Sequence, residues 1–180
     1  NLNIRVSGTE DSFWNRLIAK HEYATEYSEK SVLFKDNQKK FDIRQFEIPP
    51  YFQDKNLILS FESGKYNLTD SITNQVVFSA PLNQISQLQS EYGLWKVAIF
   101  SQDSFDAAYN IRKQSLPSAM QTLTASYSVA EKGKMTGVLG LNYQGEDKQH
   151  ITQVLNAILT AYSQPNIERR MAETAQTLKF

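Results

Sequence analysis

The fold is decided above all by residues 139–162, which read LGLNYQGEDKQHITQVLNAILTAY. Leu139, Leu141 and Tyr143 alternate along the chain as the apolar side of a β-strand does. Gly145 and two acidic residues follow, and acids are favoured at the positive end of a helix dipole. The apolar stripe of the next segment recurs at helical spacing and consists of Ile151, Val154, Leu155, Ile158, Leu159 and Tyr162. This stretch therefore predicts a strand followed by a helix.

The same alternation of strand and helix extends over residues 103–180. A short strand is indicated by three alternating positions, Tyr109, Ile111 and Lys113. Ser115 then caps a helix, and Pro117 lies in its first turn, where the missing N–H costs nothing. The apolar stripe of this helix consists of Leu116, Ala119, Met120 and Leu123. The order β-α-β-α is typical of a sheet with helices packed on it.

Pro165 interrupts the last helical pattern. A proline inside a helix costs about 3 kcal/mol, so we expect a kink, or a break with Ser163 capping a new helix. Heptad-like spacing resumes beyond it, at Ile167, Met171, Thr174 and Leu178. The chain begins at Asn1 and ends within this pattern. We therefore expect a fragment of a longer protein that contains the start of a long C-terminal helix.

Residues 41–102 are patterned with period two and predict a β-rich lobe. Strands are expected at 41–48, 76–78 and 95–100, and a β-hairpin at 57–68 around the turn Ser63-Gly64. Residues 1–40 predict an N-terminal strand, a short helix after Asp11 or Ser12 and an exposed polar loop over 21–40. The overall class is α/β (α+β), one domain with a mixed sheet, packed helices and the β-rich lobe.

Composition excludes several classes of protein. Lys and Arg number 19, Asp and Glu number 19, and the 180 residues include no cysteine. A balanced charge argues against sequence-independent nucleic-acid binding, which needs a basic surface. The lack of cysteine excludes a disulfide scaffold and thiolate chemistry. No run of about 20 apolar residues is present, so nothing in the sequence is expected to span a bilayer.

The familiar catalytic motifs do not fit this sequence. Gly133-Lys134 resembles the end of a phosphate loop, but Met135 stands where Ser or Thr is needed. His21-Glu22 begins like a zinc-protease helix, but Thr25 replaces the second histidine, and the other histidine is His150. We therefore expect no catalytic, cofactor-binding or metal-binding residue in this chain.

A specific string of residues does carry a family resemblance. Residues 128–139 read SVAEKGKMTGVL, which resembles the S-V-S-E-K-G-K-x-T-G-I-L segment of bacterial polysaccharide co-polymerases, and most closely that of Wzc-type tyrosine autokinases. The similarity continues through residues 166–170, NIERR, and looser matches occur at 109–115 and 44–49. Pro165 departs from the family pattern, which has a continuous helix there.

The resemblance implies a periplasmic domain between two transmembrane helices of an inner-membrane protein. It also implies a cytoplasmic tyrosine kinase, outside these residues, that uses ATP and Mg²⁺. Full-length members are expected to form homo-oligomeric rings of about eight copies and to regulate the chain length of capsule or exopolysaccharide. Polysaccharide and export or polymerase proteins are the implied partners, and nucleic acid is not. Without the membrane helices we expect only weak assembly, because the effective concentration is lost.

The residues that match the family motif are the candidate site, with two interpretations. They are Glu131, Lys132, Gly133, Lys134, Thr136, Gly137, Asn166, Glu168, Arg169 and Arg170. In one interpretation, residues 131–136 form a tight connection in which Gly133 adopts a positive φ. In the other, Lys132 and Lys134 meet acidic residues of a neighbouring subunit.

Two alternative functions stay open at this point. One is the periplasmic domain of a kinase-free O-antigen chain-length determinant, which shares the motif. The other is a carbohydrate-binding β module, because the β-rich lobe carries many aromatic residues that can stack on sugars.

Overall fold

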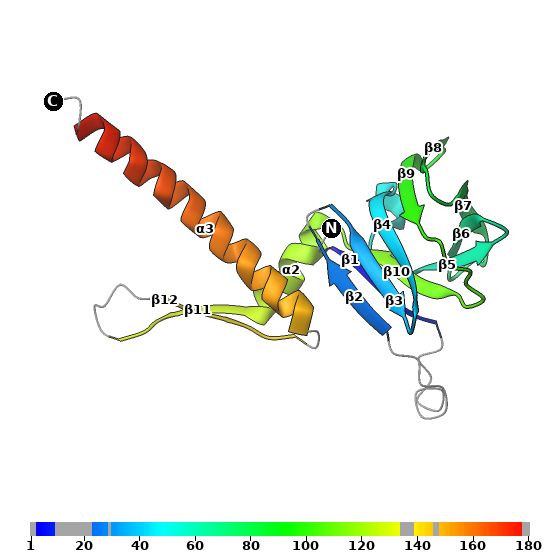
Figure 1. Ribbon diagram of the computed structural model, residues 1–180, viewed down its shortest axis with the longest axis horizontal. Helices are drawn as coiled ribbons and strands as arrows, with labels where there is room; N and C mark the ends of the chain where they lie inside the picture. The colour runs from blue at the N-terminus through cyan, green and yellow to red at the C-terminus, as the bar shows by residue number, and fades with distance from the viewer. Residues whose placement is uncertain (1–2, 10–22, 29, 134–138, 146–147, 178–180) are drawn as a thin grey trace. The chain divides into compact units, whose positions relative to one another are not determined.

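The computed structural model describes residues 3–9, 23–28, 30–133, 139–145 and 148–177 (Figure 1). The chain divides into two compact units, Asn1–Leu123 and Thr124–Phe180. Each unit is considered by itself. The short helix expected after residue 11 lies outside the described residues.

The first unit consists of two five-stranded antiparallel sheets (Figure 1). One sheet has the order β1-β10-β5-β6-β7, with strands Ile4–Gly8, Tyr109–Lys113, Leu57–Glu62, Lys65–Asp70 and Val76–Pro81. The other has the order β2-β3-β4-β9-β8, with strands Tyr23–Tyr27, Val32–Asp36, Lys39–Glu47, Gly93–Phe100 and Ile85–Ser90. The expected lobe, residues 41–102, supplies six of these strands, and strands on either side of it complete both sheets.

Every strand pair in the described part of the chain is antiparallel. The expectation of a mixed sheet is therefore wrong, because the strands are joined mainly by hairpins rather than by helical crossovers. The predicted hairpin at 57–68 is confirmed as β5–β6. Its two turn residues, Ser63 and Gly64, both have positive φ, as a type I′ hairpin turn requires.

The expectation of an exposed loop over residues 21–40 is also wrong. Strands β2 and β3 occupy half of it, and Val32 and Phe34 are fully buried. Only Asn37 and Gln38 form the turn into β4, and Asn37 has a φ of 54°. The two apolar side chains at alternate positions of β3, Val32 and Phe34, pack this polar segment against the core.

Aromatic side chains dominate the core of the first unit. Phe41 of β4 packs against Phe34, Phe61, Phe105 and Tyr109, with ring centroids 5.2 to 5.5 Å apart. These residues come from both sheets and from the loop before β10. Edge-to-face and tilted arrangements of this kind add to the gain from burying apolar surface.

Helix α2, Leu116–Ser126, begins at the predicted cap. The backbone N–H of Ser118 donates to Ser115 Oγ at 3.3 Å. Asp54 strengthens this helix start, since its carboxylate accepts from Ser115 N at 3.1 Å and from Ser118 Oγ at 2.9 Å. These hydrogen bonds hold the pKa of Asp54 below its ordinary value, with the Ser115 side chain the largest cause. No α2 side chain is buried, so its predicted apolar stripe stays accessible.

The second unit contains one strand pair and one long helix. Strands β11, Tyr127–Glu131, and β12, Leu139–Tyr143, pair antiparallel, and α3, Lys148–Thr177, packs on β12. Strand β11 was not predicted. The strand at 109–113 pairs instead with β1 and β5, so the single sheet expected over 103–180 is wrong.

Helix α3 continues through Pro165, so of the two expectations, a kink or a break, the break is wrong. The expected cap, Ser163, instead donates from its Oγ to the carbonyl of Thr160 at 3.3 Å, within the helix. The helix continues because the residues on both sides of the proline are helical and only one backbone hydrogen bond is missing. With two antiparallel sheets, a strand pair and separate helices, the observed class is α+β.

No helix among the described residues combines the length and apolar character needed to cross a membrane.

Candidate functional site

One concave site of the first unit is a pocket of about 450 Å³, here called the aromatic pocket. It is built from three segments that are distant in sequence: the 3-10 helix η1, Pro50–Phe52, the β6–β7 turn and the β8–β9 turn. The side chains that define it are Tyr51, Phe52, Asp70, Glu91, Tyr92 and Trp95.

Stacked rings form the apolar part of the aromatic pocket. Tyr51 and Tyr92 are stacked with centroids 4.6 Å apart, and each is about half exposed. Phe52 lies edge-on to Tyr92 at 5.2 Å and contacts Trp95 at 4.9 Å. Phe52 and Trp95 are buried, so the pocket has a rigid floor and an accessible aromatic wall.

Polar groups fix the rim of the same pocket. Asp70 is buried, and its Oδ1 accepts from the backbone N–H of Ile72 at 2.8 Å and of Thr73 at 3.2 Å. The Nε1 of Trp95 donates to Ser90 Oγ at 3.2 Å. On the outer rim, a hydrogen bond with Glu91 raises the pKa of the Tyr92 hydroxyl.

The sequence-predicted motif residues lie elsewhere, on two elements of the second unit. Glu131, Lys132 and Gly133 are exposed at the end of β11 and just beyond it, and Gly133 has a φ of 93°, which confirms the predicted positive φ. Glu168 and Arg169 are exposed on α3, where Asn166 and Arg170 also lie in the helix. Lys134, Thr136 and Gly137 lie outside the described residues.

This geometry does not fit a nucleotide site. A phosphate loop leads into a helix whose N-terminus holds the phosphates. Here Gly133 follows strand β11, and the next described element is strand β12. The described residues also contain no group of three or more carboxylates or histidines that could hold a metal ion.

The sequence did not predict the aromatic pocket, because aromatic residues at strand positions favour a core interpretation. Trp95 and Phe52 are indeed core residues, but Tyr51 and Tyr92 are not. The available signal was their position: Tyr51 follows the strand-ending Pro49-Pro50, and Tyr92 precedes Gly93 in a turn. Aromatic residues in turns are less often needed for packing than aromatic residues within strands.

This two-unit α+β chain is similar in sequence to parts of bacterial tyrosine-protein kinases. No family model matches it. Over its full length the chain is 58% identical to tyrosine-protein kinase ptk of Acinetobacter johnsonii, of which it covers 25%. It is 36% identical over 75 residues to tyrosine-protein kinase wzc of Salmonella typhimurium, which is 42% of this chain and 10% of the relative. A third match, to tyrosine-protein kinase etk of Escherichia coli K12, is 40% identical over 62 residues, or 34% of this chain and 8% of the relative.

The chain belongs to the family of Wzc-type tyrosine-protein kinases. It spans a quarter or less of the length of the relatives just named.

Proposed function

We propose that this chain is the non-catalytic, periplasmic assembly part of an inner-membrane tyrosine kinase that regulates the chain length and export of capsule or exopolysaccharide. The observation that carries the proposal is the match to ptk over the whole chain but only a quarter of that kinase. In this proposal the phosphoryl transfer, with its ATP and Mg²⁺, belongs to the rest of the parent protein. The relatives compared are all named as kinases, which favours this role over a kinase-free chain-length determinant.

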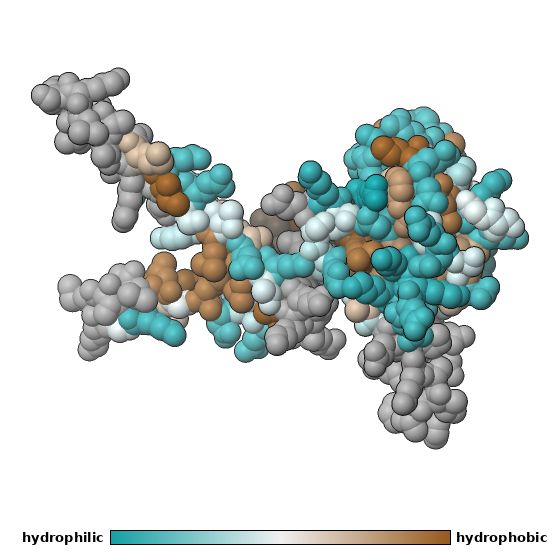
Figure 2. Space-filling view, viewed as in Figure 1, coloured by the Kyte–Doolittle hydropathy of each residue, from teal (hydrophilic) through white to brown (hydrophobic). Residues whose placement is uncertain are grey.

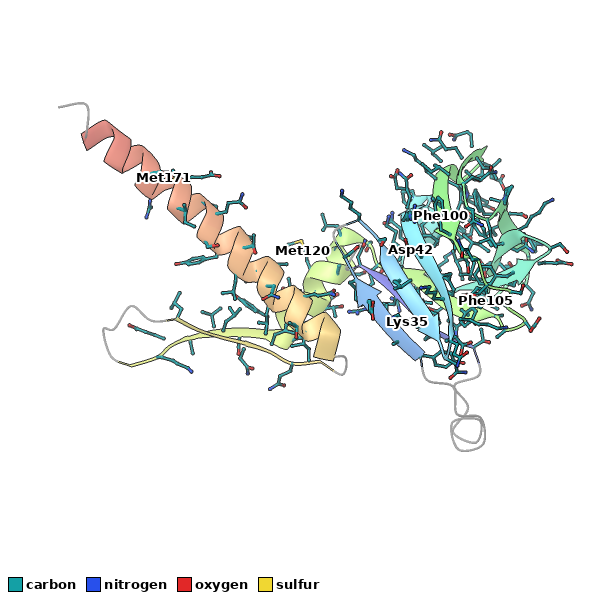
Figure 3. All side chains as sticks on the ribbon, viewed as in Figure 1. Lys35, Asp42, Phe100, Phe105, Met120 and Met171 are labelled. Carbon is teal, nitrogen blue, oxygen red and sulfur yellow. The ribbon has the colours of Figure 1, made fainter. Side chains whose placement is uncertain are left out.

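The exposed apolar residues of α3 support a role in assembly. Tyr162, Ile167 and Met171 are 64%, 56% and 67% exposed. Figure 2 shows apolar side chains gathered over the strand pair and the first half of α3, and Figure 3 shows Met171 further along the same helix. Large apolar side chains grouped on a surface mark interaction sites more often than scattered ones do.

These residues lie on two different faces of α3. Tyr162 extends the stripe that begins at Ile151, and Val154 of that stripe is buried. At about 100° per residue, Ile167 and Met171 lie roughly 140° and 180° around the axis from Tyr162. A helix with apolar surface on opposite sides fits two neighbours, as a subunit in a closed ring requires. We therefore propose homo-oligomeric contacts through α3.

The charged motif residues fit the same role. Glu131 and Lys132 lie at the end of β11, and Glu168 and Arg169 lie on the second half of α3, all exposed. Residues of both signs on two elements can pair across a repeated subunit contact and set its register. We assign the motif to subunit contact rather than to chemistry.

The compartment can be tested by labelling a single cysteine. The chain contains no cysteine, and Ile72 in the β6–β7 turn is 80% exposed. In the membrane-bound parent protein, Ile72→Cys should react with a membrane-impermeant maleimide in intact cells with permeable outer membranes. A cysteine in the kinase part should react only after lysis. Labelling of Ile72→Cys only after lysis would contradict the periplasmic assignment.

A further inference from the structure

We propose that the aromatic pocket binds one pyranose unit of a polysaccharide that carries no anionic group at that unit. The inference rests on the proposed function only for the source of the ligand. The pocket itself lies wholly within the described part of the first unit, away from the motif residues in sequence.

The aromatic pocket has the size of a small-molecule site. Its volume of about 450 Å³ lies within the range of about 300–1,000 Å³ typical of such sites, toward the small end. Tyr92 is half exposed, with one face of its ring stacked on Tyr51 and the ring also in contact with the buried ring of Phe52. A pyranose ring presents a face of C–H groups, and packing that face on a fixed aromatic ring removes apolar surface from water at little cost in side-chain entropy.

The carboxylate of Asp70 has a fixed orientation in the pocket. Asp70 is 6% exposed, and its Oδ1 is held by the N–H groups of Ile72 and Thr73. Among the described residues no hydrogen bond is made to its other oxygen, Oδ2, although the residue lines the pocket. A buried carboxylate fixed through one oxygen offers the second as a preorganised acceptor for a hydroxyl or ammonium group.

The charged residues that line the pocket are acidic. They are two carboxylates, Asp70 and Glu91, and the lining includes no lysine or arginine. Lys55 is not among the lining residues, and its Nζ lies 3.3 Å from the centroid of the Tyr51 ring as a cation–π pair. A uronic acid unit would meet like charges, whereas a neutral or amino sugar would not.

The experiment uses the 180-residue chain with Trp14→Phe, which leaves Trp95 at the pocket as the only tryptophan. Three trisaccharide probes of matched size are titrated: glucosamine trimer, cellotriose and trigalacturonate. Fluorescence and saturation-transfer NMR follow binding. We expect saturable binding of the first two probes, and trigalacturonate weaker by at least about tenfold.

Matched variants locate the binding. Tyr92→Ala should weaken binding about tenfold, while Tyr92→Phe, which keeps the ring, should not. Asp70→Asn keeps an Oδ1 acceptor for the turn and should weaken glucosamine trimer more than cellotriose. Tyr162→Ala, the same change on α3, is the control and should have no effect.

The outcomes are decisive in each case. No saturable binding of any probe at 10 mM, on the order of the weakest useful affinities, would overturn the inference. So would equal affinity for trigalacturonate, or binding that survives Tyr92→Ala unchanged. Because none of these measurements depends on assembly or compartment, their failure is distinguishable from failure of the proposed function.

Discussion

Replacing Tyr109 by phenylalanine tests how the two sheets of the first unit are held together. Tyr109 lies on β10 and is 1% exposed, and its hydroxyl donates to Asp36 Oδ2 on β3 at 2.7 Å. Asp36 is itself only 6% exposed. Burial, and then this hydrogen bond, raise the pKa of the Tyr109 hydroxyl. The bond therefore joins the two sheets through a polar pair inside an aromatic core.

The expected cost follows from what Tyr109→Phe removes. The ring contacts with Phe34 and Phe41, each at 5.3 Å between centroids, are kept. Only the hydroxyl is lost, and a buried carboxylate loses a charge-assisted hydrogen bond. Bonds of that kind are worth about 1.5–3 kcal/mol, so we expect the free energy of unfolding to fall by about that amount.

Urea denaturation of the Trp14→Phe chain, followed by Trp95 fluorescence, measures this change. Tyr51→Phe, on a half-exposed tyrosine, is the matched control and should change the free energy of unfolding by less than about 0.5 kcal/mol. Asp36→Asn combined with Tyr109→Phe should cost less than the sum of the single changes, because the two groups interact directly. A loss below about 0.5 kcal/mol for Tyr109→Phe would refute the reasoning.

Three further predictions concern other parts of the chain. Asp54→Ala should lower the free energy of unfolding by about 1 kcal/mol near pH 7. Because the pKa of Asp54 is lowered on folding, its contribution to the free energy of unfolding is present above about pH 4 and is lost as pH falls through the folded pKa. In urea titrations, the free energy of unfolding of the variant should therefore fall less on acidification than that of the unchanged chain. Burial raises the pKa of Tyr66 and of Tyr109. The free energy of unfolding should therefore fall as pH rises above about 10, by up to about 1.4 kcal/mol per pH unit for each tyrosine. In Tyr109→Phe this free energy should decline less steeply with pH. Pro165→Ala should stabilise the second unit by up to about 3 kcal/mol with unchanged helicity in circular dichroism, whereas a rise in helicity would mean that α3 is broken in solution.

Alternation along the chain was sufficient to predict most strands of the first unit. In β4, buried residues change phase between Ile43 and Phe46, because a bulge at Arg44 adds one residue opposite β9. The sequence shows that change of phase, so the strand could be predicted across it. Segment 23–36 could not, because its strands are polar on one face and only tertiary burial of Val32 and Phe34 orders them.

The candidate sites were predictable to different degrees. The motif around Gly133 is contiguous in sequence, so the positive φ of this glycine could be predicted from the sequence alone. The aromatic pocket unites Tyr51, Asp70 and Tyr92 from three segments. Their proximity depends on how β6, β7, β8 and β9 are ordered in two sheets, which periodicity does not specify.

The central claim, assembly through both apolar faces of α3, is tested most directly by cysteine crosslinking in the membrane-bound parent protein. A double variant, Tyr162→Cys with Ile167→Cys, places one thiol on each exposed face, because unlike faces meet in a closed ring. We predict that a short bifunctional maleimide joins subunits of the double variant, but not of either single variant or of Ile72→Cys in the first unit. Adding Met171→Asp to the double variant should weaken the crosslinks, because it places a charge on one apolar face. Equal crosslinking from position 72, or none from the double variant, would contradict the proposed assembly.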